Sequence, residues 1–279
     1  TSGARGGAMT TSVERFDEKA QSGFGKIGRT VVHEGELLRH PVYTRFLHWM
    51  VAIFFFLALL SGLAIYSPWL FRWLAPLFGG GPTTRLLHPW FGLFFVIFYA
   101  LQSLNWLALM RWTGSDSKWL RNIRRYIGGE EKVEPDYVGF FNGGQKLQFW
   151  EIVFGGAVLL LTGLMMWFPE LFGRILVAIS YVIHDIAALI MLFGIWIHIY
   201  LSTIGQPGTL QAMTRGVVTR AWAWTNHPAW YRESTGRDPR EDYERALEGQ
   251  QKRRHLRERE RAMQEEEPPK RDPVDSPGD

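Results

Sequence analysis

The 279-residue sequence contains no cysteine. This absence excludes disulfide bonds, iron–sulfur clusters held by cysteine thiolates, and haem attached covalently through a CxxCH motif. Any iron–sulfur chemistry linked to this chain must therefore lie on a partner. The N-terminal region also lacks a short apolar segment followed by a small-residue cleavage site, so we expect no cleavable signal peptide.

Charged residues are scarce in four apolar blocks, and each block is about as long as the twenty residues that cross a bilayer. The sequence therefore predicts an all-α integral membrane protein, a four-transmembrane-helix bundle. The expected spans are 45–66, 86–110, 147–168 and 175–204. They divide the chain into an N-terminal arm (1–44), a membrane domain (45–205) and a charged, partly disordered tail (206–279). Residues 1–8 precede Met9 and look like a cloning remnant or an upstream extension.

The distribution of basic residues predicts the orientation. Of the 31 Lys and Arg residues, only Arg72, Arg85 and Arg174 lie in the loops 67–87 and 169–174. The rest fall in the arm, the tail and the linker between the second and third spans. By the positive-inside rule both termini and that linker are cytoplasmic, and the two poorer loops face outward. Since the basic residues flank membrane spans, the pI of 9.4 does not indicate nucleic-acid binding.

Two histidines inside the fourth span are the strongest functional signal. His184 and His198 are fourteen residues apart, which on a helix is about 21 Å and nearly four turns, so both side chains leave the same face. Ionisable or ligating side chains in hydrocarbon are costly and mark functional sites by default. His48 near the start of the first span and His88 near the start of the second complete a set of four.

The predicted topology assigns each histidine a depth in the membrane. His48 matches His198 on the cytoplasmic side, and His88 matches His184 on the outer side. Two imidazoles from different helices of a bundle are the ligands of a low-spin haem b, so we expect two haems b. Zinc fits less well because two ligands would leave a tetrahedral shell half empty. Proton relay or simple packing between helices remains the alternative for these histidines.

Other residues fit the haem interpretation. Arg45 and Arg85 each precede a histidine by three residues and could pair with haem propionates, although snorkelling to the interface explains them equally well. Gly62 lies fourteen residues after His48 and should leave room for the second haem. Asp185 is expected to be the one carboxylate deep in a span. The other histidines are expected to be solvent-exposed or to face a partner: His33, His40, His227 and His255.

Several motifs occur in a recognisable order. They are RFLHW in the first span, LHPWFG in the second, FFNGGQKLQFW at the start of the third, and two histidines fourteen residues apart in the fourth. Together they resemble the γ subunit of respiratory formate dehydrogenase, a dihaem cytochrome b, over about residues 38–205. The resemblance implies a quinone site formed by Asn142, Gly144 and Gln145 beside His198. From the residues alone, NGGQ is equally an ordinary helix-entry turn.

The resemblance implies a membrane anchor and electron conduit in the bacterial inner membrane. An iron–sulfur β subunit would deliver electrons to the outer haem, and the inner haem would reduce menaquinone or ubiquinone. Formate oxidation itself would occur on a molybdenum- or tungsten-dependent α subunit. Two alternatives remain open: the cytochrome b of another quinone-linked oxidoreductase, such as a hydrogenase or thiosulfate reductase, and a haem-free membrane transporter or anchor.

Overall fold

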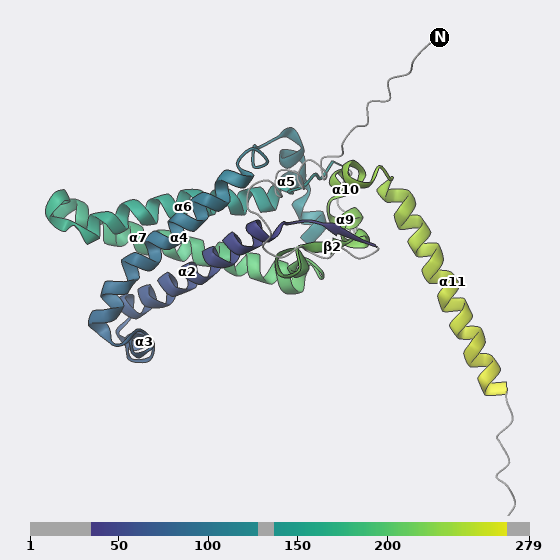
Figure 1. The fold of residues 1–279 in the computed structure, drawn as a ribbon, viewed down its shortest axis with the longest axis horizontal. Helices are drawn as coiled ribbons and strands as arrows, with labels where there is room; N and C mark the ends of the chain where they lie inside the picture. Colours follow the sequence, from purple (N-terminus) through teal and green to yellow (C-terminus); the bar gives the residue numbers. More distant parts are fainter. Residues whose placement is uncertain (1–34, 128–136, 267–279) are drawn as a thin grey trace, which may run out of the picture.

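The computed structural model describes residues 35–127 and 137–266. Four long helices form its central part (Figure 1), and each is long and apolar enough to cross a membrane. They are α2 (Val42–Tyr66), α4 (Gly81–Trp106), α6 (Gly143–Trp167) and α7 (Pro169–Tyr200), and η2 (Leu201–Gly205) extends the last of them. Only 11–17% of the most apolar stretch in each helix is buried inside the protein, so most of this surface is left for lipid.

The four helices form two antiparallel hairpins that pack through contacts between α4 and α6. The first hairpin is α2 and α4, joined through α3 (Pro68–Leu74) and a short 3₁₀ helix, η1 (Ala75–Phe78). The second is α6 and α7, joined directly at Phe168. Gly173 has a φ of 73° inside the first turns of α7, which bends the chain before the long apolar part begins.

A small folded region closes one end of the bundle. β1 (Glu36–Leu38) pairs with β2 (Val217–Thr219) in an antiparallel register that sets Leu37 opposite Val218. The helices around this sheet are α8 (Leu210–Thr214), α9 (Arg220–Asn226) and α10 (Pro228–Thr235). We call this the sheet end of the bundle and the opposite end the α3 end; they lie at the right and left of the helices in Figure 1.

The sheet end has its own hydrophobic core, built from both terminal segments. Val218, Trp222, Trp230 and Tyr231 are buried there. Beneath them lies Arg39, which is 3% exposed. We define the Arg39 cluster as Arg39, Phe140, Trp222, His227 and Trp230. The Arg39 guanidinium carbon is 3.9 Å from the Phe140 ring centre and 4.3 Å from that of Trp230, so cation–π attraction replaces part of its lost hydration.

Two further helices lie outside the bundle. α5 (Gly114–Ile127) packs against the start of α6, and α11 (Pro239–Glu266) is a 28-residue charged helix that leads away from the sheet end (Figure 1). The base of α11 is attached by Asp242, whose carboxylate accepts a 2.6 Å hydrogen bond from the Tyr231 hydroxyl.

Four features of the structure differ from the sequence-based expectations. The first, second and third spans begin three to five residues earlier than predicted, because their polar first turns are helical too. Residues 206–235, assigned to the tail and not to the membrane domain, form a hydrophobic core together with the strand before α2. His40 and His227 are not exposed: they are 5% and 1% exposed. Asp185 is not the one carboxylate within a span, since Glu151 lies inside α6.

Candidate functional site

The four histidines of the spans form two pairs across the bundle. His48 on α2 and His198 on α7 have ring centres 6.2 Å apart at the sheet end. His88 on α4 and His184 on α7 have ring centres 6.3 Å apart nearer the α3 end. These are the two pairings predicted from depth. Each brings together helices from different hairpins, so the pairs exist only when both hairpins are assembled.

The spacing of each pair suits one metal ion between two imidazoles. A metal–nitrogen bond of about 2 Å on each side, plus about 1.1 Å from each nitrogen to its ring centre, requires about 6.2 Å between the centres. Within the described ranges, no three His, Cys, Asp or Glu side chains come together to hold a metal ion. A two-ligand site fits a metal whose other ligands come with the cofactor, as in haem.

Hydrogen bonds orient the rings at the α3 end. His88 Nδ1 lies 3.1 Å from the Ala58 carbonyl oxygen, which can only accept, so Nδ1 carries the proton. The Thr162 hydroxyl donates to the Val158 carbonyl at 2.7 Å and accepts from His184 Nδ1 at 2.8 Å. In both rings the proton on Nδ1 leaves the Nε2 lone pair free. Such outer partners fix the tautomer of metal-binding histidines.

Glycines make space around the same pair. A Cβ added to Gly62 would lie 3.0 Å from His88 Cε1, closer than ordinary side-chain contacts. A Cβ on Gly163 would lie 3.6 Å from His184 Cε1, which is an ordinary contact. Gly62 therefore leaves space for the His88 ring itself, and the space that we expected it to leave for a second haem lies at this same histidine pair, whereas Gly163 tolerates a small side chain.

Buried polar atoms without partners gather at the sheet end. Within the described residues, His48 Nδ1 and both amide atoms of Gln102 have no hydrogen-bond partner, although Gln102 is only 2% exposed. The antiparallel register of α2 and α4 sets Gly62 against His88 and stacks Phe54 on Phe98, which places Gln102 level with His48. Since orphaned buried amides are costly, these atoms fit a polar cofactor held between the helices.

The two arginines predicted near propionates have different surroundings. Arg45 donates to the Thr214 carbonyl at 2.8 Å, and Trp49 donates to the Met213 carbonyl at 3.1 Å. Both side chains fasten α8 to the first turns of α2. Arg85 is exposed one turn before His88. Both arginines thus lie at the level of a histidine pair, and Arg45 also has a structural role.

The residues predicted for quinone binding begin α6. The Asn142 side chain accepts from the Gln145 amide at 2.9 Å, and the Gln145 side chain accepts from the Asn142 amide at 3.0 Å. This is a capping box, the helix-entry turn that the sequence also allowed. A Cβ on Gly144 would lie 2.9 Å from the Trp119 ring, so this glycine allows α5 to approach.

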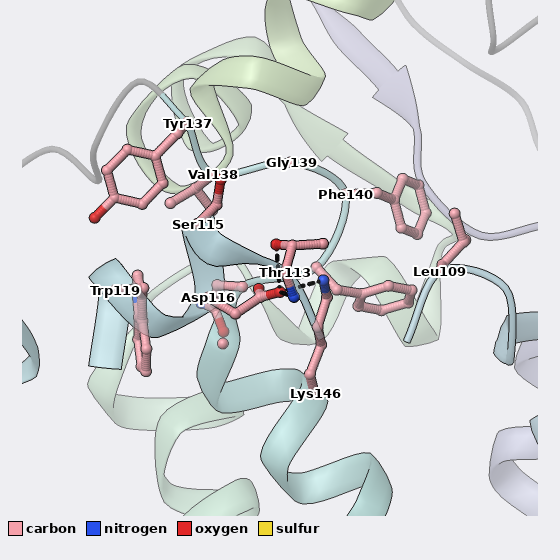
Figure 2. A pocket seen from close by; sticks show the side chains of 13 residues that line it. Leu109, Thr113, Ser115, Asp116, Trp119, Tyr137, Val138, Gly139, Phe140 and Lys146 are labelled. Atoms are coloured by element: carbon pink, nitrogen blue, oxygen red, sulfur yellow. Dashed lines mark hydrogen bonds and ion pairs between the residues drawn. The ribbon is translucent and has the colours of Figure 1, made fainter. Parts of the chain in front are cut away.

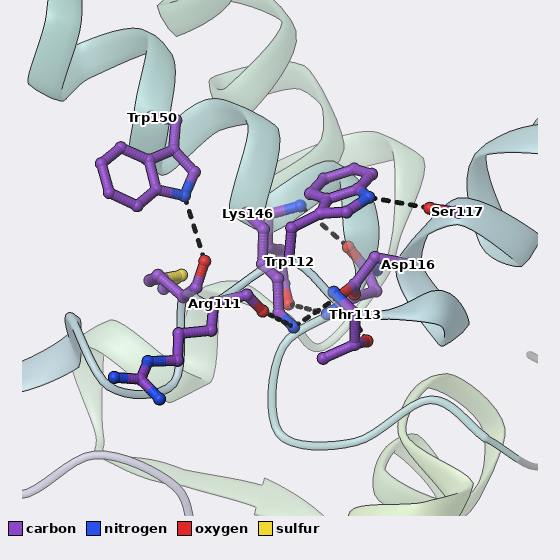
Figure 3. Close-up of polar contacts among 10 residues, drawn as sticks. Arg111, Trp112, Thr113, Asp116, Ser117, Lys146 and Trp150 are labelled. Atoms are coloured by element: carbon purple, nitrogen blue, oxygen red, sulfur yellow. Dashed lines mark hydrogen bonds and ion pairs between the residues drawn. The ribbon is translucent and has the colours of Figure 1, made fainter.

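A cavity of about 170 Å³ lies beside this turn (Figure 2). Asn142 and Lys146 line it, but Gly144, Gln145 and His198 do not. On its wall the Lys146 ammonium lies 2.8 Å from the Asp116 carboxylate and donates to the Arg111 carbonyl at 3.0 Å (Figure 3). Burial raises the pKa of Asp116, but hydrogen bonds from Lys146 and Thr113 outweigh it, so the pKa lies below its ordinary value.

Four residues of the site were missed in the sequence: Ser61, whose hydroxyl lies 3.0 Å from His88 Nδ1, Thr162, Gln102 and Glu151. The sequence nevertheless contains a feature that could have identified them. Each is a polar residue inside an apolar span, where such side chains are rare and usually face the bundle interior. A helical repeat could have placed Gln102, because it follows His88 by fourteen residues, as Gly62 follows His48.

Four bilayer-length apolar helices with two opposed imidazole pairs define the class: a helical membrane protein with two paired-histidine sites. A model of the prokaryotic cytochrome b561 family matches residues 39–216. The cytochrome b556(Fdn) subunit of the nitrate-inducible formate dehydrogenase of Escherichia coli (strain K12) is 36% identical over 217 residues, 76% of this chain and 97% of the relative. The formate dehydrogenase cytochrome b556 subunit of Haemophilus influenzae is 31% identical over 73% of this chain and 85% of its own length.

A third relative, the formate dehydrogenase cytochrome b556(fdo) subunit of E. coli (strain K12), is 33% identical over 71% of this chain and 92% of its own length. The chain belongs to the prokaryotic cytochrome b561 family and groups within it with the cytochrome b subunits of formate dehydrogenases. The resemblance predicted from the sequence motifs is thereby confirmed. Family membership implies an integral membrane protein of bacteria that carries haem b.

Proposed function

We propose that this chain conducts electrons across the membrane from an iron–sulfur partner to a quinone, through two haems b. His88 and His184 hold one haem, and His48 and His198 hold the other. The observation that carries this proposal is the pair of ring-centre separations, 6.2 and 6.3 Å, each suited to one iron between two imidazoles. A bound haem supplies one-electron transfer at each site, and His184 and His198 on one helix set the distance between the two.

The direction of transfer follows from the charge distribution. The described parts of the N-terminal segment, the linker and the C-terminal segment begin or end at the sheet end, and these three segments contain most of the basic residues, so we assign this end to the cytoplasm by the positive-inside rule. The iron–sulfur subunit then docks at the α3 end, and a molybdenum- or tungsten-dependent subunit oxidises formate beyond it. Moving an electron inward over half the bilayer, against a potential of order 100 mV, conserves about 1 kcal/mol.

Quinone reduction belongs at the sheet end in this proposal. Asn142, Gly144 and Gln145 at the start of α6 and His198 near the end of α7 form the site implied by the family resemblance. The antiparallel packing of α6 and α7 supports it, because it brings both segments to the same end of the bundle. Arg45 and Arg85, at the levels of the inner and outer pairs, are the proposed partners of haem propionates.

The test is the haem content of the purified complex and of four single variants. We expect two haems b per chain by pyridine haemochrome, reduced by formate and reoxidised by quinone. His48→Ala and His198→Ala should each remove the same spectral component, and His88→Ala and His184→Ala the other. Subunits that co-purify identify the donor, since a nickel–iron enzyme would exclude formate dehydrogenase. An intact complex without haem would overturn the proposal.

A further inference from the structure

Glu151 is a carboxylate inside a membrane span, and its position is defined by contacts on two sides. It follows the start of α6 at Gly143 by eight residues, about 12 Å of helix. Its Oε2 atom accepts a 2.8 Å hydrogen bond from Gln148 Nε2, one turn nearer the sheet end. On its other side the carboxylate lies against Gly194 of α7, where an added Cβ would overlap it.

The Glu151 carboxylate lies close to the inner histidine pair. Gly194 precedes His198 by four residues, so the two share a face of α7 one turn apart, about 6 Å along the axis. Gly194 is buried, and its missing side chain admits the carboxylate between α6 and α7. Glu151 is therefore near the haem level assigned to His48 and His198, on the side of the bundle interior.

The charge of Glu151 has no partner cation in the described part of the chain. The nearest lysine along α6, Lys146, forms an ion pair with Asp116 and donates a hydrogen bond to the Arg111 carbonyl. Near the level of Glu151, the neighbouring helices carry the titratable groups Tyr99 of α4, whose hydroxyl donates to the Phe149 carbonyl at 2.7 Å, and His198 of α7. A carboxyl group without a cation in such a place is stable when it carries a proton, and a functional role is its default interpretation.

A line of polar side chains runs along α6 between the sheet end and this carboxyl group. Gln145, Gln148 and Glu151 recur every third residue and follow one side of α6 from its first turn inward. The rest of the helix is almost wholly apolar from Ile152 to Trp167. The line therefore starts at the end assigned to the cytoplasm and stops at Glu151.

We infer that Glu151 carries a proton from the cytoplasmic side to the quinone reduced at the inner haem. This rests on the proposed function. A quinone that accepts two electrons from the haem also needs two protons. Glu151 supplies one of them and cytoplasmic water supplies the other. The Glu151 O–H bond breaks, an O–H bond forms at a quinone oxygen, and the carboxylate regains a proton from cytoplasmic water that reaches it along the side of α6 where Gln145 and Gln148 lie. The electrons come from the partner subunits, so the carboxyl group is unchanged after each turnover.

The test uses the intact purified complex and follows the haems directly. Wild type, Glu151→Gln and Glu151→Asp are reduced with formate and then mixed with menadione or decylubiquinone in a stopped-flow instrument at several pH values. Glu151→Gln keeps the hydrogen bond to Gln148 but cannot carry a proton. Glu170→Gln, at the first turn of α7 on the α3 end, is the matched loss of a carboxylate.

We expect Glu151→Gln to leave the haem spectra and the reduction by formate unchanged and to slow reoxidation by quinone about 10²-fold. Glu151→Asp should restore part of the rate and its pH dependence, and Glu170→Gln should behave as wild type. Wild-type reoxidation in Glu151→Gln, or equal slowing in Glu151→Gln and Glu151→Asp, would overturn the inference. Failure of the proposed function is distinct, because the wild-type complex would then lack haem or resist reoxidation by quinone.

Discussion

At the scale of single residues, small side chains determine where the histidines can lie. Gly62 leaves the space that the His88 ring occupies, and the Ala58 carbonyl beside it fixes the ring proton on Nδ1. Thr162 does the same for His184 from α6. In each ring, the nitrogen left free for the proposed haem iron is therefore set by an uncharged neighbour on another helix, which costs less in a membrane than a charged partner.

Gly62→Val should remove the haem of the outer pair and spare the inner one. The valine Cβ would lie only 3.0 Å from His88 Cε1 and its methyl groups need further room, so the ring must shift from its position opposite His184. Pyridine haemochrome and low-temperature spectra of the purified complex measure the loss. Gly92→Val on α4 is the matched control, because nothing lies within 4 Å of a Cβ added there. Equal haem content in both variants would contradict the role given to Gly62.

At the scale of elements, one ion pair joins α5 to α6. Asp116 and Lys146 have side chains only 5% and 9% exposed, and Thr113 adds two 2.7 Å hydrogen bonds to the same carboxylate oxygen. This pair orients the amphipathic α5 against the start of α6, beside the capping box of Asn142. The turn proposed for quinone binding is thus stabilised both by its own capping box and by the ion pair with α5.

Replacing one partner of this ion pair should destabilise the protein more than replacing both partners together. Lys146→Met or Asp116→Asn alone leaves a buried polar group without its partner, which typically costs about 3–5 kcal/mol. The double variant should lose less than the sum of the two. Apparent melting temperatures in detergent measure these differences, with Lys118→Met, at an exposed position on α5, as the control. Additive single-variant losses would show that the two side chains act independently.

At the scale of the whole molecule, the Arg39 cluster binds both terminal segments to the loop before α6. Burial lowers the pKa of Arg39 to about 9. His227 donates through Nδ1 to the Gly139 carbonyl at 2.7 Å, and its Nε2 lies 3.4 Å from the Arg39 guanidinium. Burial and then the Arg39 charge hold the pKa values of His227 and His40 well below their usual range. Both imidazoles are therefore neutral in the folded protein.

Acid should loosen the sheet end. In the unfolded chain these histidines bind protons below about pH 6.5, whereas in the fold they do not, so the unfolded state gains protons first. Their contribution to stability is complete above that pH and falls by about 1.4 kcal/mol per pH unit for each histidine below it. Melting temperatures from pH 8 to 5 test this. His227→Gln should flatten the profile, whereas His255→Gln, exposed on α11, should leave it as in wild type.

Much of the fold was predictable because hydrocarbon imposes simple rules. Four apolar blocks of bilayer length became α2, α4, α6 and α7, and the fourteen-residue spacing of His184 and His198 placed both on one face. The boundaries shifted because capping and turn residues, such as Asn142 and Gln145, extend a helix beyond its apolar part. Residues 1–34, 128–136 and 267–279, where part of the arm and tail predictions fall, lie outside the described residues.

The sequence alone determined the membrane class, the four spans, the histidine set and, through depth, its pairing, since all of these depend on periodicity and transfer of side chains into lipid. Only the tertiary structure decided that His40 and His227 are buried and that the Glu151 carboxylate lies against Gly194. These facts depend on which helices face each other and in what register. Contacts between residues distant in the chain are decided by packing, which local sequence patterns do not specify.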